Sequence, residues 1–184
     1  LGDADFAIGG GAESMSKAAY ASTTARWGAR MGDTGMVDMM VGALTDPFDT
    51  VHMGITAENV AEKWGLSRDD QDAFSVESHQ RAARAIAEGR FKDQILPVTL
   101  KSRKGDTIFD TDEHVRGDIT AEGLAKLRAV FKKDGSVTAG NASGINDGAA
   151  AVVLAEAGAA AAAGATPMGR LVSYVFAGVD PKIM

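Results

Sequence analysis

The sequence predicts a mixed α/β fold, and three observations support this prediction. Short apolar runs bounded by glycine, at residues 5–10 and 149–155, have the length and composition of strands. Between them, residues 67–88 carry a helical pattern that opens on a capping-box pair, Ser67 and Asp70. Near the end, residues 170–176 are rich in β-branched and aromatic side chains and predict a further strand.

Composition limits the classes of protein that this chain can represent. With 184 residues, 45% hydrophobic and 24% charged, it is long enough for one good core or two small ones. No apolar run reaches the roughly 18 residues of a membrane span, and the start lacks the basic region of a signal peptide. A net charge of -6 argues against general binding of nucleic acid or anionic membranes. We therefore expect a cytoplasmic protein with no nucleic-acid or membrane partner.

The first part of the chain is expected to open on a strand and continue as loops. Residues 5–10 predict a central strand, and the three glycines that begin at Gly9 predict a sharp exit from it. Residues 14–41 are rich in Met, Gly and small side chains without a clear period, so a surface loop is one interpretation of them. Residues 44–54 contain Pro47 and also predict a loop.

Two helices are expected next. The first is indicated by apolar residues at helical spacing and by Gly65, which is placed to end it. The second starts at Ser67 and can run to Glu88 before Gly89 ends it. We expect the core side of this second helix to carry Ala73, Phe74, Ala83 and Ile86.

The second half alternates strands and short helices. Residues 95–100 and 107–109 predict two strands that flank a turn with three cations. Residues 120–128 predict a short helix with its two leucines inward. Residues 149–155 fit a buried strand, and residues 156–163 form an alanine-rich helical pattern that ends at a glycine.

The stretch at residues 136–153 has an unusual density of small residues. Gly140, Gly144 and Gly148 recur every four residues, and Asn, Ser and Asp stand between them. Such small side chains let another group approach the backbone closely, and the polar ones form hydrogen bonds within turns. The stretch therefore predicts a tight loop beside a ligand. The alternative is a plain glycine turn that feeds the following strand.

The segment TAGNASGINDGAAA, at residues 138–151, resembles a segment of the thiolases, which make or cleave 3-ketoacyl-CoA by Claisen chemistry. Three further segments agree with the family in order: GGGAESMS at 9–16, HMGITAENVA at 52–61 and LSRDDQDAFSVESHQRA at 66–82. The resemblance spans the whole chain. It is similar to the short-chain, biosynthetic acetyl-CoA C-acetyltransferases, also called beta-ketothiolases.

The resemblance implies a five-layered αβαβα fold in a parent enzyme, of which this chain is an internal fragment. It implies that residues 1–14 end the N-terminal core half and that residues 15–145 form an inserted loop domain for CoA binding and assembly. Residues 146–166 would complete the N-terminal half, and residues 167–184 would begin the C-terminal half. The chain has no cysteine, so it has neither disulfides nor thiolate metal sites, and the family's catalytic residues would lie outside it.

The resemblance also implies an activity: condensation of two acetyl-CoA molecules to acetoacetyl-CoA and CoA, by a homotetramer that needs no cofactor or metal. Positions that match CoA-binding positions of the family are His52, Met53, Arg116, Leu124, Ala139, Ser143 and Gly144. Gly123 departs from the Ser that is common at its position in biosynthetic members.

Two questions remain open from the sequence. The cationic turn of Lys101, Arg103 and Lys104 lies near the charged end of CoA on one interpretation and is a solvated hairpin tip on the other. The function has two alternatives. One is a degradative 3-ketoacyl-CoA thiolase of broader chain length, disfavoured by His52 in its HMG context, and the other is a non-catalytic module for CoA binding or oligomerisation.

Overall fold

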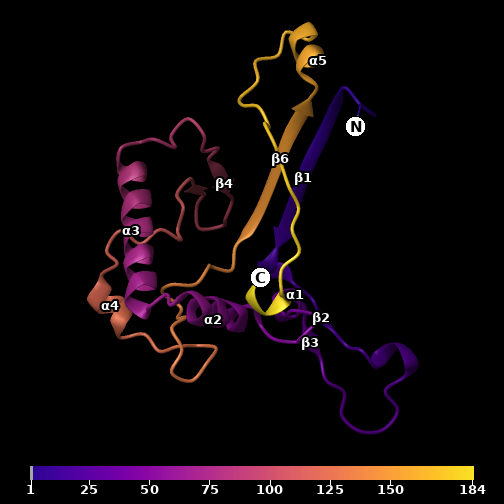
Figure 1. The fold of residues 1–184 in the computed structure, drawn as a ribbon, viewed down its shortest axis with the longest axis vertical. Coiled ribbons are helices and arrows are strands. Elements are labelled where there is room, and N and C mark those ends of the chain that lie inside the picture. Colours follow the sequence, from indigo (N-terminus) through magenta and orange to yellow (C-terminus); the bar gives the residue numbers. More distant parts are fainter. Residues whose placement is uncertain (1) are drawn as a thin grey trace. The chain divides into compact units, whose positions relative to one another are not determined.

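A computed structural model describes residues 2–184 of the chain (Figure 1). The chain divides into two compact units. The first comprises the residues up to Asp46 together with Ile145–Asp180, and the second comprises Pro47–Gly144 together with Pro181–Met184. No helix among the described residues is both long enough and apolar enough to cross a membrane.

The first unit is built on one long antiparallel pair of strands, β1 (Phe6–Ser14) and β6 (Asp147–Ala155). The pair is in register over its whole length, from Phe6 opposite Ala155 to Ser14 opposite Asp147. The predicted exit at the three glycines is therefore wrong. The strand continues through them because Gly9, Gly10 and Gly11 pair with small or β-branched residues of β6 across the ladder.

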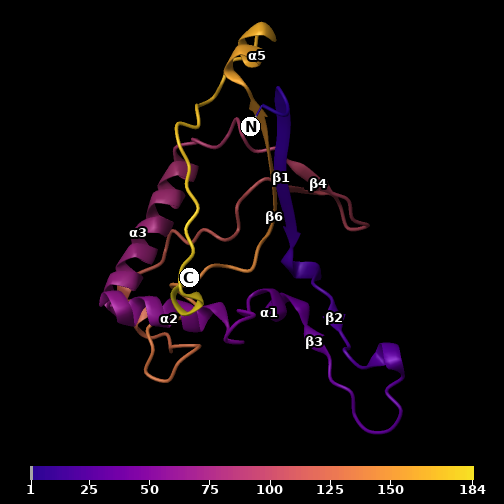
Figure 2. The same cartoon turned by 45° about the vertical axis from the view of Figure 1, so that its right-hand side comes forward.

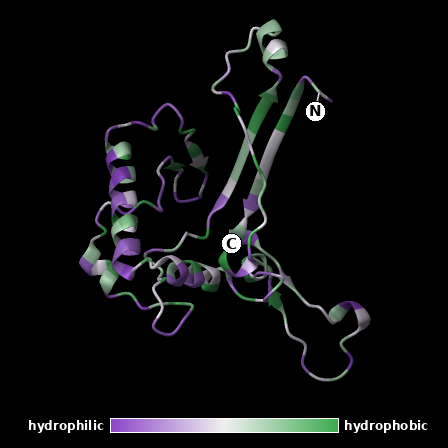
Figure 3. Cartoon of the chain, viewed as in Figure 1, coloured by the Kyte–Doolittle hydropathy of each residue, from purple (hydrophilic) through white to green (hydrophobic). Residues whose placement is uncertain are grey.

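The apolar side chains of this strand pair are exposed, which corrects the prediction of buried strands. Ile8 is 80% exposed and Val153 is 71% exposed, and Figure 3 shows hydrophobic residues along both strands. The predicted strand at residues 170–176 is also absent, and its apolar residues are exposed. Among the described residues the β1–β6 sheet has only two strands.

The remaining elements of the first unit are short. Strands β2 (Tyr20–Ala21) and β3 (Val37–Asp38) pair antiparallel and lead into helix α1 (Met39–Ala43). Single 3-10 turns occur at Met15–Lys17 and Ala25–Trp27. The alanine-rich helix α5 (Ala157–Ala162) follows β6 as predicted.

The second unit contains the two predicted helices, and their ends are those that the caps indicate. Helix α2 (Met53–Trp64) ends at Gly65, whose φ of 64° is left-handed. Helix α3 (Arg68–Ala87) begins at Ser67, where the capping box with Asp70 is complete. Both views show α3 rising from the end of α2 (Figure 1, Figure 2).

Three smaller elements complete the second unit. Strands β4 (Val98–Leu100) and β5 (Thr107–Phe109) form the predicted antiparallel hairpin. Helix α4 (Ala121–Ala125) packs against α3 and buries Leu124 as predicted. The prediction for Leu127 is wrong, because the helix ends before residue 127 and this side chain is 38% exposed. The 3-10 turn Pro181–Ile183 packs on α2, where Asn59 donates a hydrogen bond of 2.9 Å from Nδ2 to the carbonyl oxygen of Lys182.

The inward face of α3 differs from the predicted one. Ala73, Phe74 and Ile86 are exposed, and Phe74 is 76% exposed, although Ala83 is half-buried as expected. The residues that point inward follow the same helical period on another face: Asp72, Ser75, Val76, His79, Ala82 and Ala83. The prediction followed the apolar residues, whereas the side of α3 that packs on the rest of the unit is anchored by the buried carboxylate of Asp72.

We expect the N-terminal cap of α3 to contribute measurably to stability. The Ser67 side chain accepts a hydrogen bond from the Asp70 amide, and Ser67→Ala leaves that amide without this partner. The loss should be about 1 kcal/mol of unfolding free energy, measured by urea denaturation. Ser78→Ala, at an exposed position within the same helix, is the control and should cost nothing. Equal losses in both variants would contradict the role of the cap.

Candidate functional site

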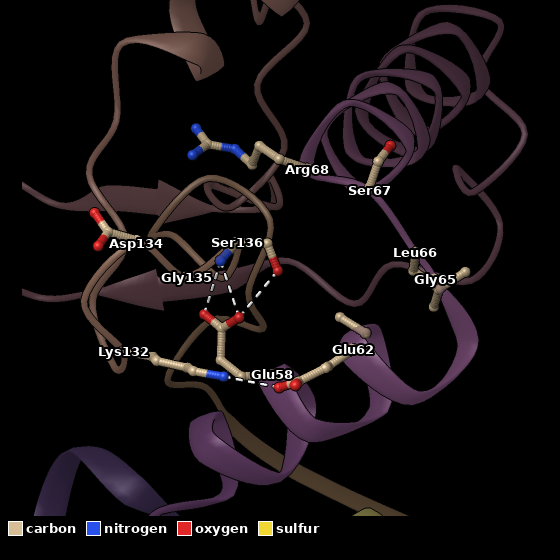
Figure 4. Close-up of a pocket in the computed structure, with 11 residues that line it drawn as sticks. Glu58, Glu62, Gly65, Leu66, Ser67, Arg68, Lys132, Asp134, Gly135 and Ser136 are labelled. Atoms are coloured by element: carbon tan, nitrogen blue, oxygen red, sulfur yellow. Dashed lines mark hydrogen bonds and ion pairs between the residues drawn. The ribbon is translucent and has the colours of Figure 1, made fainter.

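The glycine loop, residues 136–144, is held at its start by the buried carboxylate of Glu58 on α2 (Figure 4). The amide of Ser136 donates to both carboxylate oxygens at 2.9 Å, and its hydroxyl donates at 3.0 Å. The amide of Val137 donates at 2.8 Å. These donors come from two consecutive residues, so the carboxylate fixes the entry to the loop.

The environment of Glu58 favours its charged form. Burial by itself raises the pKa of this carboxyl, but the amides of Ser136 and Val137, the Ser136 hydroxyl and the positive charge of Lys132 outweigh burial. The net pKa lies below the ordinary value for Glu. Beside it, the exposed Lys132 ammonium lies 2.8 Å from the Glu62 carboxylate, and this contact raises the pKa of Lys132 and lowers that of Glu62.

A second buried carboxylate, Asp72 on α3, holds the middle of the loop. It accepts hydrogen bonds from Arg68 Nε at 2.7 Å and from Asn141 Nδ2 at 2.9 Å. The same Asn141 nitrogen donates to the carbonyl oxygen of Ser136 at 3.0 Å, and Asn141 Oδ1 accepts from the Thr138 amide at 2.7 Å. The Asn of the glycine motif is therefore occupied with protein partners and shapes the loop.

The network continues from α3 to the end of α4. Arg68 donates from its terminal nitrogen to the carbonyl oxygens of Leu124 at 2.6 Å and Leu127 at 3.2 Å. The Leu124 carbonyl lies in the last turn of α4, and the Leu127 carbonyl lies just beyond its end. One guanidinium thus joins α3, α4 and, through Asp72, the glycine loop.

Gly140 is required by the close approach of α4. A Cβ atom built at this position would fall inside van der Waals contact with the side chain of Leu124 and would lie 2.7 Å from Leu127. A larger residue would require the side chains of Leu124 and Leu127, or α4 itself, to shift. Close backbone approach, which the motif predicted toward a ligand, is used here by two leucines of the same chain.

A cavity of about 500 Å³ opens beside the glycine loop, and we call it the Arg116 cavity. Its lining comes from α3, the segment before α4, α4 and the glycine loop: His79, Glu113, His114, Arg116, Asp118, Ile119, Thr120, Gly123, Leu124, Leu127, Ala139, Gly140 and Ala142. Three residues that the sequence assigned to CoA, Arg116, Leu124 and Ala139, line it together. Its lining contains charged groups of both signs and apolar groups from α4 and the glycine loop.

The other predicted binding residues do not line this cavity. His52 caps α2, with its Nδ1 accepting from the Gly54 amide at 3.0 Å, and its ring stacks on Phe131 with centroids 4.7 Å apart. The neighbouring Met53 begins the helix. Ser143 is exposed, and its hydroxyl contacts only the Gly144 carbonyl among the described hydrogen bonds.

The cationic turn of Lys101, Arg103 and Lys104 is exposed in the hairpin between β4 and β5. A second cavity of about 500 Å³, drawn in Figure 4, lies around Glu58. None of the predicted site residues lines it. No cluster of His, Cys, Asp or Glu that could hold a metal ion occurs in the part of the chain that the structure describes.

Sequence reasoning missed the residues that shape the site. Glu58, Arg68, Asp72 and His79 lie on the two predicted helices, and the sequence assigned them no role in a site. For Glu58 a signal existed, because it lies three residues before Ala61 and so shares the inward face of α2. A charged residue on an inward face needs a partner, and that requirement could have been used. Asp72 has one local partner, Arg68 four residues earlier, but its partner in the glycine loop lies 69 residues away. The partner of His79 lies 37 residues away, and neither distant contact follows from a local pattern.

Comparison with known proteins was made on the sequence and on the structure. The sequence profile of a family described as "Thiolase, N-terminal domain" matches residues 1–158. The chain is 63% identical over 185 residues to beta-ketothiolase BktB of Cupriavidus necator and 54% identical over 185 residues to an acetyl-CoA acetyltransferase of Pseudomonas aeruginosa. In both cases the match covers 100% of this chain and 47% of the relative, so the chain spans about half the length of these proteins.

Solved structures agree with the sequence matches. The crystal structure of the Bacillus anthracis acetyl-CoA acetyltransferase superposes with a TM-score of 0.89 at 47% identity, over 100% of this chain and 46% of that one. Human mitochondrial 3-ketoacyl-CoA thiolase in complex with CoA superposes with a TM-score of 0.87 at 41% identity, over 97% of this chain and 45% of that one.

We expect Glu58→Gln to destabilise the protein although it changes the side-chain shape little. The substitution removes a charged acceptor from several donors, and the new amide NH2 group can face those donors without bonding to them. The free energy of unfolding should therefore fall by about 1.5 to 3 kcal/mol. Glu62→Gln, one turn along α2 and exposed, is the matched control and should have a small effect. Denaturation at neutral pH compares them, and equal effects would contradict the anchoring role.

The effect of Glu58→Gln should depend on pH. Because folding lowers the pKa of Glu58, its carboxylate contributes fully above the ordinary Glu range and loses its contribution as the pH falls below that range. The stability difference between wild type and variant should therefore be constant near neutrality and shrink in acid. A difference that grows as the pH falls from 5 to 3 would have the wrong sign.

Gly140→Ala should overpack the loop against Leu124 and Leu127. We expect it to lower the free energy of unfolding by about 1 to 3 kcal/mol. Gly148→Ala is the control, since a Cβ at that position of β6 meets nothing within 4 Å. Thermal unfolding of both variants tests this expectation. A Gly140→Ala protein as stable as the control would show that α4 moves away at no cost.

Proposed function

This chain belongs to the thiolase family, and we propose that it is part of an acetyl-CoA C-acetyltransferase. The complete enzyme would condense two acetyl-CoA molecules to acetoacetyl-CoA and CoA, and would run the reverse thiolysis. The sequence identity of 54% to 63% with proteins of these names supports the proposal. The observation that carries it is the convergence of Arg116, Leu124 and Ala139 on one cavity beside the glycine loop.

We further propose the arrangement of this chain within a five-layered αβαβα enzyme. Residues 1–14 and 146–166 would belong to the N-terminal core half, residues 15–145 to an inserted loop domain, and residues 167–184 to the start of the C-terminal half. The family match over residues 1–158 and the TM-score of 0.89 support the assignment in outline. The complete enzyme would be a cytoplasmic homotetramer.

The role of this chain in the reaction would be to bind and orient the substrate. The covalent step needs a thiolate, and this chain has no cysteine, so the reacting groups would come from the rest of the enzyme. Binding energy from the remote nucleotide positions the thioester for attack. Arg116 would face the phosphates, because a guanidinium can hold one with two hydrogen bonds.

The other predicted residues would contact the rest of the substrate. Leu124 and Ala139 would form the wall around the nucleotide. Ser143 and Gly144 would line the channel for the pantetheine arm. His52 and Met53 would lie near the thioester. The cationic turn at residues 101–104 would add charge near the phosphates.

A second candidate is a 3-ketoacyl-CoA thiolase of broader chain length. The structural match to the human mitochondrial 3-ketoacyl-CoA thiolase, at 41% identity, favours it. Assays of the complete protein with acetoacetyl-CoA and with longer 3-ketoacyl-CoA thioesters separate the two enzymes. Activity toward acetoacetyl-CoA that is lost for 3-ketoacyl groups longer than four carbons would support the acetyltransferase. If the complete protein bound CoA but turned over neither class, a non-catalytic CoA-binding module would be the remaining function.

Arg116→Ala should weaken the use of CoA thioesters, with KM higher by about three- to tenfold and kcat little changed. Thioesters of pantetheine, which lack the nucleotide, should be used as well as by the wild type. Arg128→Ala, an exposed arginine outside the cavity, is the control. Equal losses for both substrate types would show that Arg116 supports the fold and does not contact the nucleotide.

A further inference from the structure

The Arg116 cavity contains a histidine that is not part of the glycine loop and has no role in the proposed reaction. His79 lies in the middle of α3, half-buried, and lines the cavity. Its Nδ1 accepts a hydrogen bond of 3.1 Å from the backbone amide of Arg116. The ring of His114 lies beside it, with centroids 5.8 Å apart. His79 therefore joins the most regular element of the unit to the segment that carries Arg116.

The direction of this contact is set by the backbone. A backbone amide can only donate, so His79 Nδ1 is the acceptor. His79 acts toward Arg116 as an acceptor in a defined position. The acidic and basic side chains that line the cavity come from the segment that carries Arg116: Glu113, Arg116 and Asp118.

The segment from Asp110 to Ile119 has few other ties. Its remaining hydrogen bonds are local: the His114 amide to Asp112, the Thr111 hydroxyl to Asp110, and the Ile119 amide to the Arg116 carbonyl. In the part of the chain that the structure describes, no other hydrogen bond joins it to a different element. Gly117 rests on Ala83 of α3, one helical turn beyond His79. The place of Arg116 thus depends on a single directional contact.

We propose that His79 is a positioning residue, which sets the affinity for the nucleotide end of the substrate by holding the Arg116 backbone at the cavity. This rests on the function proposed above, in that Arg116 faces the CoA phosphates. His79 touches none of the reacting atoms. An arginine on a free loop would lose conformational entropy on binding, and His79 removes much of that cost beforehand.

The test compares two substitutions of His79 in the complete enzyme. His79→Leu keeps an apolar side chain but removes the acceptor, whereas His79→Asn places a carbonyl oxygen near the position of Nδ1. We expect His79→Leu to raise KM for acetoacetyl-CoA about two- to tenfold with kcat unchanged. His79→Asn should return KM to within about twofold of the wild type. KM for the matching pantetheine thioester should not change in either variant.

Two further measurements separate positioning from general damage. In an Arg116→Ala background, His79→Leu should have no additional effect on KM, because the group that it positions is gone. Hydrogen exchange at the Arg116 amide should be faster in His79→Leu and slow again in His79→Asn. An Asn variant no better than Leu, equal losses for both substrates, or additive effects in the double variant would each overturn the proposal.

Hydrogen exchange also distinguishes this proposal from the function on which it rests. If the wild-type enzyme neither bound nor turned over CoA thioesters, the proposed function would fail and the nucleotide role of His79 would fail with it. If the enzyme worked but the Arg116 amide exchanged equally in wild type and His79→Leu, the positioning role alone would be overturned.

Discussion

The buried carboxylate of Glu58 is the constraint on which the candidate site depends. A buried charge is costly unless donors surround it, and its donors are two successive residues at the start of the glycine loop. If the glycine loop moved away from α2, the Glu58 carboxylate would become exposed or would lose its hydrogen-bond donors. Asp72 repeats the arrangement on α3 through Asn141. Two carboxylates on two helices thus fix one loop, and the Arg116 cavity forms where this loop meets α4.

This arrangement gives the glycine-rich motif two uses. Thr138 and Asn141 face the protein, and protein partners occupy the hydrogen-bonding groups of Asn141. Gly140 lies against Leu124 and Leu127 and also lines the cavity. Ala139 and Ala142 line the cavity beside them. Both interpretations of the segment therefore apply: some of its residues form a structural turn, and others line a cavity that could hold a ligand.

The sequence predicted those features that are set locally. The ends of α2 and α3 follow from Gly65, Ser67 and Asp70, because caps act within one turn of the chain. The inward face of α3 and the partners of Glu58 could not be predicted in this way, since they depend on residues tens of positions away. The prediction that β1 and β6 are buried failed for a related reason. A strand pattern is local, but burial requires other elements to cover the sheet, and the apolar side chains of this two-stranded sheet are exposed.

Charge alone does not explain how such a site would select an anionic nucleotide. The chain carries a net charge of -6, and Glu113 and Asp118 line the same cavity as Arg116. Charges farther apart than about 8 Å are largely screened at physiological salt, so the field of the whole chain contributes little. Within the cavity, a guanidinium among carboxylates attracts a phosphate only if it is held closer to the ligand than they are. Selection would then depend on the position of Arg116, and the backbone that positions it is tied to α3 by one imidazole nitrogen.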